Sequence, residues 1–261
     1  MKSVRKIDWD AAQNRRETGR LGHVLYNSES CYIMASKLPA GVEGAPTHVH
    51  ICDQLYYIIE GELEIELGAE TVVARAGEGV FIPAGLPHCN RNVSGTDEVH
   101  VEVIAPSVRA GKPLATFVGD DPLPAYDGPP GLVSSRGSTV PNKVIDMSWL
   151  IRHSTGSHHA GMYVADMPPN HPGLRTHVHD FDQFYLVLSG QLEVEVALER
   201  HSVGPNSLVV IPAGVPHRQW NGSEEPERHV AILAPEPDFP SSPERRWDTV
   251  VDFGVSDTQL H

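Results

Sequence analysis

The chain carries one ligand-rich stretch twice, first as Thr47-His48-Val49-His50-Ile51-Cys52-Asp53-Gln54 and again as Thr176-His177-Val178-His179-Asp180-Phe181-Asp182-Gln183. The second copy follows the first by 129 positions (177 − 48 = 129). A later pair keeps that offset (217 − 88 = 129), namely Pro83-Ala84-Gly85-Leu86-Pro87-His88 and Pro212-Ala213-Gly214-Val215-Pro216-His217. About 26 of the 60 positions in 47–106 are identical in 176–235 without a gap. A register held over that length indicates a duplicated domain.

The spacing of the histidines indicates that each copy holds half of a metal site on one strand. Successive side chains of a strand point to opposite faces, so His48 and His50 project from the same face. Imidazole is the commonest metal-binding side chain. Apolar runs bounded by Gly and Pro predict further strands at 55–59, 62–67 and 80–82, and at 184–188, 192–196 and 208–211. His88 enters the strand after the Pro-Ala-Gly turn, and we expect it to lie close to the first two histidines.

This pattern resembles the cupin superfamily, and its doubling resembles a bicupin. The matching motif residues are His48, His50, Gly61, Pro83, Gly85, His88 and Asn92, and His177, His179, Gly190, Pro212, Gly214, His217 and Asn221. The resemblance implies an all-β fold of two tandem antiparallel barrels of the double-stranded β-helix, or jelly-roll, type. It also implies one divalent metal ion in the mouth of each barrel. The implied ligands are His48, His50, Gln54 and His88 in the first barrel, and His177, His179, Gln183 and His217 in the second.

The fourth ligand position departs from the family pattern, because most cupins have Glu where this chain has Gln54 and Gln183. Cupins with Gln there include an enzyme family that opens unsaturated sugar uronates and a bicupin isomerase family of dipeptide-antibiotic biosynthesis. Three imidazoles and an amide are neutral, so a divalent ion would keep its full charge and polarise an anionic chelating substrate strongly. Alternatively, both glutamines are hydrogen-bonded polar groups of the barrel and not ligands. Fe²⁺ is favoured by the many cupin oxygenases, but such ligands also suit Mn²⁺, Ni²⁺, Co²⁺ or Zn²⁺.

Further side chains are candidates for catalysis beside these ligands: His100, Glu102, Tyr56, His229 and Tyr185. His100 and His229 keep the common offset, and they can be further ligands, acid–base groups, supports of a ligand, or rim residues facing solvent. Glu102 shares the face of His100, whereas the second copy has Ala231 there, so an inward His100 would give only the first site a carboxylate base. The two tyrosines share a face with the glutamines and could donate to a substrate oxygen. We therefore expect the two sites to differ.

Three residues close to the ligands have simpler interpretations. Asp53 and Asp182 recur beside the glutamines and are expected to hydrogen-bond the loop or a ligand imidazole. Cys52 lies within the ligand loop, but its counterpart is Phe181, so the loop does not need a thiol.

Composition restricts the class of partner. The 261 residues carry a net charge of −14, and the pI is near 5.4, which argues against nucleic acid or an anionic membrane as partner. We expect a small, anionic substrate instead. The start of the chain lacks the apolar core of a signal peptide, and no apolar run reaches the length of a membrane span. The odd count of 3 cysteines fits reduced thiols and a cytoplasmic location.

The expected organisation is an N-terminal cupin domain over 1–120, a linker over 121–143 and a C-terminal cupin domain with a tail over 144–261. The polar residues 1–25 are expected to add a helix or an edge strand, and the linker is rich in Pro, Gly and Ser. The apolar tail at 247–255 is expected to pack back on the domain or to meet a partner subunit. Cupins often pair through strand edges, so a homodimer is possible, although a bicupin can also mimic a dimer within one chain.

Three functions agree with these observations. The first is a dioxygenase that cleaves an enolic, phenolic or dicarbonyl substrate on iron, and the abundance of cupin oxygenases favours it. The second is a redox-neutral isomerase, cyclase or lyase acting on a sugar acid or 2-oxo acid, which the neutral ligand set favours. The third is a non-enzymatic cupin that binds a metal or small molecule, against which two intact ligand sets count.

Overall fold

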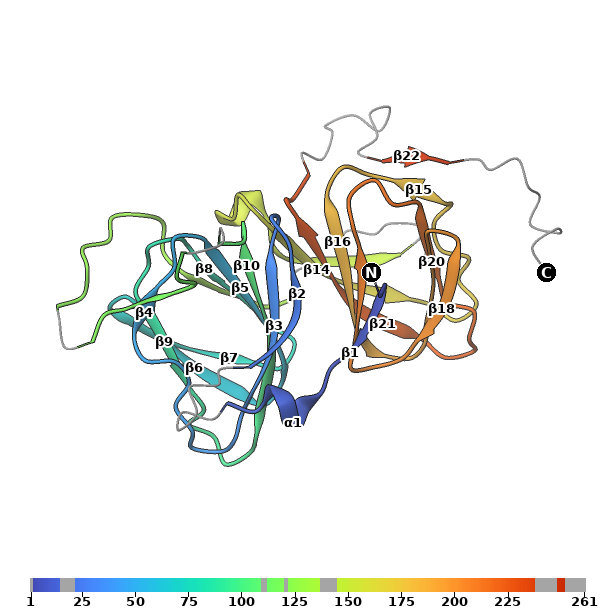
Figure 1. The fold of residues 1–261 in the computed structure, drawn as a ribbon. Coiled ribbons are helices and arrows are strands. Elements are labelled where there is room, and N and C mark those ends of the chain that lie inside the picture. Colours follow the sequence, from blue (N-terminus) through green and yellow to red (C-terminus); the bar gives the residue numbers. More distant parts are fainter. Residues whose placement is uncertain are drawn as a thin grey trace.

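The computed structural model describes residues 2–14, 22–108, 112–119, 122–136, 145–237 and 248–251. These residues form two β-barrels that lie side by side, each built from a six-stranded and a five-stranded antiparallel sheet (Figure 1). The prediction of an all-β fold with two tandem barrels is confirmed. Parts of the predicted linker (137–143) and tail (238–247 and 252–261) lie outside the described residues.

Barrel 1 contains the first copy of the ligand stretch. Its six-stranded sheet has the order β12 (Leu132–Ser134), β8 (Gly79–Ile82), β5 (Asp53–Glu60), β10 (Glu98–Ala105), β3 (Tyr32–Leu38) and β2 (His23–Asn27). Its five-stranded sheet has the order β11 (Thr116–Phe117), β4 (His48–Val49), β9 (His88–Arg91), β6 (Glu62–Leu67) and β7 (Glu70–Arg75).

Barrel 2 contains the second copy. Its six-stranded sheet has the order β1 (Val4–Lys6), β19 (Ser207–Ile211), β16 (Asp182–Ser189), β21 (Glu227–Ala234), β14 (Gly161–Met167) and β13 (Asp146–Ile151). Its five-stranded sheet has the order β18 (Glu199–Val203), β17 (Leu192–Val196), β20 (His217–Trp220), β15 (His177–Val178) and β22 (Thr249–Val250). The described helices are short: α1 (Trp9–Ala12) and the 3-10 turn η2 (His153–Thr155).

Burial along the strands shows which sheet faces water. In β6 the leucines and the isoleucine are buried while the glutamates are half-buried, as expected for a sheet with one solvated face. All 8 residues of β10 are buried, so this strand is covered on both faces. One face lines the interior of barrel 1, and the other face belongs to a core shared by both barrels.

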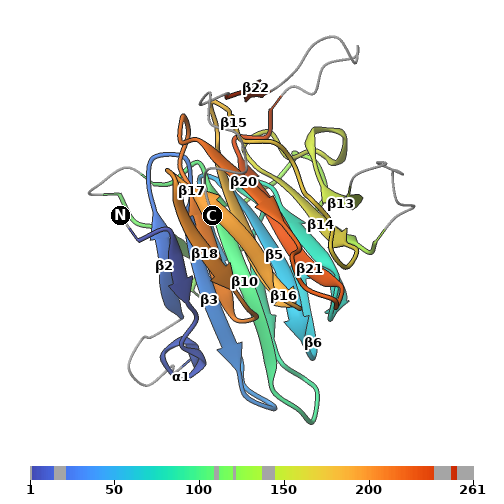
Figure 2. The same ribbon diagram turned by 90° about the vertical axis from the view of Figure 1, so that its right-hand side faces the viewer.

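The shared core lies between the two six-stranded sheets, which pack face to face (Figure 2). Residues at equivalent positions of the two copies meet there: Leu55, Val103 and Ile33 from barrel 1, and Phe184, Ile232 and Met162 from barrel 2. Neighbours in register point to the same side, so the intervening Tyr56, Glu102 and Met34 face the interior of barrel 1. This alternation assigns one set of side chains to the inter-barrel core and the other set to the metal site.

The first strand of the chain belongs to the second barrel. β1 pairs with β19 from Val4↔Val209 to Lys6↔Ser207, and Trp9 Nε1 donates to Asn206 Oδ1 at 2.9 Å. In the predicted linker, β12 pairs with β8 and so extends the sheet of barrel 1. The domain bounds at 120 and 144 stay a prediction. Within the predicted N-terminal domain, β1 joins barrel 2, and within the predicted linker, β12 joins barrel 1.

Two short straps run along the strands that carry the His-x-His pairs. β11 pairs with β4 and places Phe117 opposite His48, and β22 pairs with β15 and places Val250 opposite His177. The part of the tail that the structure describes therefore packs back on barrel 2, as one of the two expectations had it. Among the described residues, no helix has the length and apolar character needed to cross a membrane.

Candidate metal centres

Three buried imidazoles converge in each barrel. His48, His50 and His88 form one triad and His177, His179 and His217 form the other, and within each triad the candidate ligand atoms lie within 4.8 Å of one another. The register explains the convergence, because His48 is the partner of His88 and His177 is the partner of His217. Each set of residues could hold a metal ion.

The hydrogen bonds of the triads fix the tautomer of every imidazole. Each Nδ1–H donates to a backbone carbonyl, and the acceptors, in the order of the histidines, are Pro46, Leu114, Leu86, Arg175, Phe181 and Val215, at 2.7 to 2.9 Å. A carbonyl can only accept, so the proton of each neutral imidazole is on Nδ1 and the lone pair is on Nε2. This arrangement is typical of metal-binding histidines, whose second nitrogen is oriented by a backbone acceptor.

The Nε2 atoms face one another in a way that a cation would stabilise. In barrel 1 the Nε2 atoms of His48 and His50 are 3.2 Å apart, and both are acceptors. His88 Nε2 and His217 Nε2 are buried and have no hydrogen-bond partner. Burial lowers the pKa of His48 and His50, places the pKa of His88 well below its ordinary value, and lowers that of His217 to about 3. These imidazoles are therefore neutral at pH 7, as metal ligation requires.

A glutamine lies beside each triad, and a different residue interacts with each amide. Gln54 Nε2 donates to Glu102 Oε2 at 2.9 Å, and its buried Oε1 has no hydrogen-bond partner. Gln183 Oε1 lies 2.9 Å from His179 Nε2, while the side chain of Gln183 lies near the hydroxyl of Tyr163 and offsets part of the rise that burial causes in the pKa of that phenol. In both barrels a carbonyl oxygen thus joins three imidazole nitrogens. This donor set fits a divalent ion, and its unpaired acceptors argue against a purely hydrogen-bonding role.

The residues that border the two glutamines differ between the barrels at two neighbouring positions. Barrel 1 has Glu102 and Met34 in register on neighbouring strands, whereas barrel 2 has Ala231 and Tyr163 at the equivalent places. Glu102 accepts from the amide of Gln54, and the hydroxyl of Tyr163 takes that part for Gln183. At the position equivalent to Glu102, barrel 2 therefore has no carboxylate beside its glutamine.

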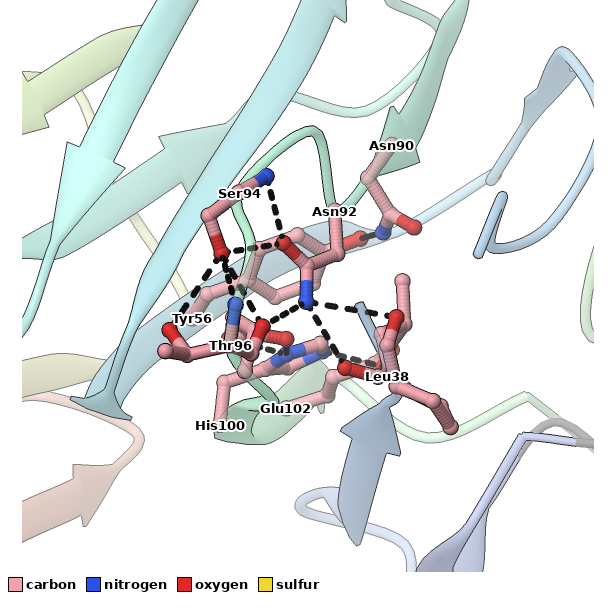
Figure 3. A network of polar contacts seen from close by, with 10 residues as sticks. Leu38, Tyr56, Asn90, Asn92, Ser94, Thr96, His100 and Glu102 are labelled. Atoms are coloured by element: carbon pink, nitrogen blue, oxygen red, sulfur yellow. Dashed lines mark hydrogen bonds and ion pairs between the residues drawn. The ribbon is translucent and has the colours of Figure 1, made fainter. Parts of the chain in front are cut away.

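Glu102 belongs to a row of buried, hydrogen-bonded charged side chains along β10, of which Figure 3 labels His100 and Glu102. His100 is fully buried; its Nδ1 donates to Glu98 at 2.9 Å, and its Nε2 donates to Glu102 Oε1 at 3.1 Å. Burial lowers the pKa of His100, but the two carboxylates outweigh that effect and raise it to about 10. His100 is therefore a cation at pH 7. It is buried within the barrel, and it is not among the residues of the triad.

The stability of the protein should decrease at alkaline pH because of this histidine. The pKa of His100 lies above the value near 6.5 of an unfolded histidine. Its stabilising contribution is complete below pH 6.5 and is lost as the pH rises through about 10. We expect the free energy of unfolding from urea titrations to fall between pH 7 and 10 more steeply in the wild type than in a His100→Gln variant. Equal slopes would contradict the charged state of His100.

Barrel 2 repeats only part of this row of charged side chains. His229 Nδ1 contacts Glu227 at 2.9 Å, as His100 contacts Glu98, but Ala231 ends the series. Tyr56 accepts a hydrogen bond from Asn90 at 3.3 Å, whereas the hydroxyl of its counterpart Tyr185 is buried without a partner. The two interiors therefore differ in charge and in hydrogen bonding, as the sequence predicted.

The aspartates beside the glutamines hold loops and join the barrels. Asp53 Oδ1 accepts from Ala84 N at 3.1 Å, and Asp182 Oδ1 accepts from Ala213 N at 2.8 Å, in the turn before the third histidine. The second oxygen of Asp182 accepts from three hydroxyls of barrel 1, those of Tyr26, Ser28 and Ser30, at 3.4, 3.3 and 2.5 Å. The second oxygen of Asp53 accepts only from the backbone of His158, at 3.4 Å. The expected loop contacts are confirmed; the contacts across the barrels were not predicted.

Asn92 and Asn221 fasten the turn beyond the third histidine. The amide of Asn92 donates to the carbonyls of Leu38 and Thr96, and its oxygen accepts from Ser94, as Figure 3 shows. Asn221 makes the equivalent contacts in barrel 2. These motif residues shape the barrel and do not belong to the histidine clusters.

The sequence analysis missed three residues that shape the sites. Glu98 and Glu227 were not considered, although both keep the 129-residue offset and stand two residues before a repeated histidine. That pattern could have revealed them. Tyr163 had no such signal, because its counterpart is Met34 and only the folded sheet brings it to Gln183.

Comparison with known families agrees with this geometry. The family model described as a cupin domain matches the chain twice, over residues 35–104 and 163–233, which together make up more than half of the chain. The chain belongs to the cupin family. Each match includes one histidine triad, so the protein is a bicupin.

Individual relatives of this bicupin are distant. A curated protein named "Polyketide synthase CurC" from Streptomyces cyaneus is 36% identical over 69 residues, which cover 24% of this chain and 44% of that protein. The match thus spans less than half of that relative's length.

Solved structures show the same fold at low sequence identity. AerE from Microcystis aeruginosa has a TM-score of 0.63 at 17% identity, over 82% of this chain and 91% of that one. Oxalate decarboxylase from Bacillus subtilis, in a study of its Mn(II) centres, has a TM-score of 0.61 at 13% identity, over 81% and 71% of the two chains. The proteins that resemble this bicupin thus include enzymes, and one of them is described with manganese.

Proposed function

We propose that this bicupin is a metal-dependent enzyme that moves a proton within a small anionic substrate in barrel 1, without net oxidation. The observation that carries the proposal is Glu102, whose carboxylate borders the proposed ligand Gln54 and is absent from barrel 2. Glu102 is 8% exposed, so it lies close to the interior surface without being sealed off.

The donor set supports a divalent ion in each barrel, held by three imidazole Nε2 atoms and one amide oxygen. A bound ion would chelate the carboxylate or carbonyl oxygens of the substrate and acidify the neighbouring C–H group. Because all four ligands are neutral, the charge of the ion favours an anionic substrate. A 2-oxo acid or a sugar acid has this chemistry.

The residues of barrel 1 would divide the work as follows. Glu102 takes a proton from the acidified carbon and returns it to another carbon of the same substrate, so that a double bond shifts and no electrons are lost. His100 donates to Glu102 Oε1 at 3.1 Å and holds the carboxylate in place. Tyr56 lies in register with Glu102 on the same face and is suited to donate to a substrate oxygen.

Dioxygenase cleavage of an enolic or phenolic substrate is the second candidate, with iron as its metal. Barrel 2 supports it, because Ala231 and Tyr163 border Gln183 there and no carboxylate takes the place of Glu102. The two candidates differ in their need for oxygen and in the metals that they should accept.

A solvent-exchange experiment separates these candidates. The metal content of the purified protein is measured, the protein is reloaded with Zn²⁺, Mn²⁺ or Fe²⁺, and 2-oxo acids and sugar acids are incubated with it in D₂O without oxygen. We expect NMR to show deuterium entering a carbon-bound position, with Zn²⁺ or Mn²⁺ sufficient for exchange. Oxygen uptake that requires Fe²⁺, without anaerobic exchange, would replace this proposal by the dioxygenase.

A further inference from the structure

A groove of about 510 Å³ lies at the seam between the barrels, where the first strand of barrel 2 approaches the outer strand of barrel 1. Its lining comes from the N-terminal segment and from β2, and we call it the seam groove: Lys2, Val4, Arg5, Lys6, His23, Val24 and Leu25. Four of these seven residues are basic or histidine. The volume lies within the range of small-molecule sites, which is about 300–1,000 Å³.

The register of the strands directs two of these side chains into the seam. Arg5 is the partner of Leu208, and His23 is the partner of Ala35. Leu208 and Ala35 both belong to the shared core between the barrels. Because partners in register point to the same side, Arg5 and His23 project toward the seam from opposite barrels. The guanidinium of Arg5 also lies over the ring of Tyr26, 5.7 Å from its centroid, which supports the direction of this side chain.

Two nitrogen atoms of the groove lack a hydrogen-bond partner among the described residues. Arg5 Nε and His23 Nδ1 are buried, and neither makes a hydrogen bond. In the described ranges, none of Lys2, Arg5 and Lys6 forms an ion pair, although the whole chain has a net charge of −14. Buried nitrogens in native proteins are nearly always paired with protein, water or a ligand. Positive groups left unpaired in an acidic protein indicate a partner of opposite charge.

We propose that the seam groove binds a small organic anion that carries at least two negative charges, either a phosphate monoester or a dicarboxylate. Arg5 and His23 would hold the anion from the two barrels, and Lys2 and Lys6 would add positive charge at the rim. Leu25, which belongs to the shared core, provides an apolar contact for the remainder of the molecule. Such a ligand would connect β1, which belongs to the sheet of barrel 2, to barrel 1. The site is separate from both histidine triads and does not depend on the proposed reaction.

Calorimetric titration of the full-length, metal-loaded protein at low ionic strength tests this site. The probes are phenyl phosphate, inorganic phosphate and succinate, which distinguish a phosphate ligand from a carboxylate ligand. We expect at least one probe to bind one equivalent per chain at the groove, and to raise the melting temperature. The double variant Arg5→Gln and His23→Gln should weaken that binding at least tenfold.

Two controls keep the test decisive. The variant Arg75→Gln removes an exposed cation on the far sheet of barrel 1 and should bind the probe as the wild type does. Lys2→Gln with Lys6→Gln changes only side chains at the rim and should weaken binding several-fold even if the first double variant unfolds. Anions that bind at the metal centres would be unaffected by all of these changes. The proposal would be overturned if both double variants bound the probes as strongly as the wild type does, or if no probe showed saturable binding to the wild type.

Discussion

A Glu102→Gln substitution is expected to lower kcat by about 10²–10⁴-fold, the usual contribution of a positioned acid–base group. The new amide keeps the size of the side chain, and its oxygen can still accept from Gln54 Nε2, as Glu102 does at 2.9 Å. The metal content should therefore stay at the wild-type level while turnover is lost. Elemental analysis and the deuterium-exchange assay on the same preparation measure both quantities.

The matched control for this variant lies in barrel 2. Tyr163→Phe removes the hydroxyl that orients Gln183, and it should weaken the second centre without slowing proton transfer in the first. Equal losses of turnover in Glu102→Gln and Tyr163→Phe would contradict the assignment of the reaction to barrel 1. A Glu102→Gln enzyme with wild-type turnover would contradict the role of the carboxylate altogether.

An Asp182→Ala substitution is expected to destabilise the protein by about 3 kcal/mol, because it leaves several buried donors without their acceptor. Asp182 accepts from Ala213 N and from the hydroxyls of Tyr26, Ser28 and Ser30. The loss removes a tie between the barrels and frees the strand that carries Gln183. Thermal unfolding should show a melting temperature lower by several degrees, since each kcal/mol shifts it by roughly 2–4 °C in a chain of this size.

The equivalent substitution in barrel 1 provides the comparison. Asp53 accepts only from two backbone amides, those of Ala84 at 3.1 Å and His158 at 3.4 Å, so Asp53→Ala should cost clearly less. Metal analysis of Asp182→Ala should show weaker retention in barrel 2 than in barrel 1. If Asp53→Ala and Asp182→Ala melt at the same temperature, the three hydroxyls do not contribute as we infer.

The repeated stretch predicted the fold and both triads because their information is local. A His-x-His pair sets two side chains on one face of a strand, and alternation along β6 and β10 follows directly from the side-chain period of two. The gapless offset of 129 residues then transfers the strands and the histidine triad of the first barrel to the second.

What the sequence did not predict depends on tertiary context. A strand of 3 residues such as β1 has no pattern that selects its neighbour, and its pairing with β19 is decided by which sheet edge is free. The replacement of Glu102 by Ala231 was visible in the sequence, but the accompanying replacement of Met34 by Tyr163 was not linked to it, since the two positions adjoin only across a sheet. The seam groove arises from strands of two barrels and has no continuous sequence motif.

The pairing of β1 with β19 has a consequence for the chain as it is synthesised. Trp9 and Asn206 are 197 positions apart, so β1 must wait after its own synthesis for nearly the entire second barrel before the edge strand β19 is available. Contacts between such remote residues slow folding, because the loop between them has to close first. The six-stranded sheet of barrel 2 is therefore completed by a strand that precedes barrel 1 in the chain. If the chain were cut between the barrels, barrel 2 would lack an edge strand, and β1 would be left without its partner.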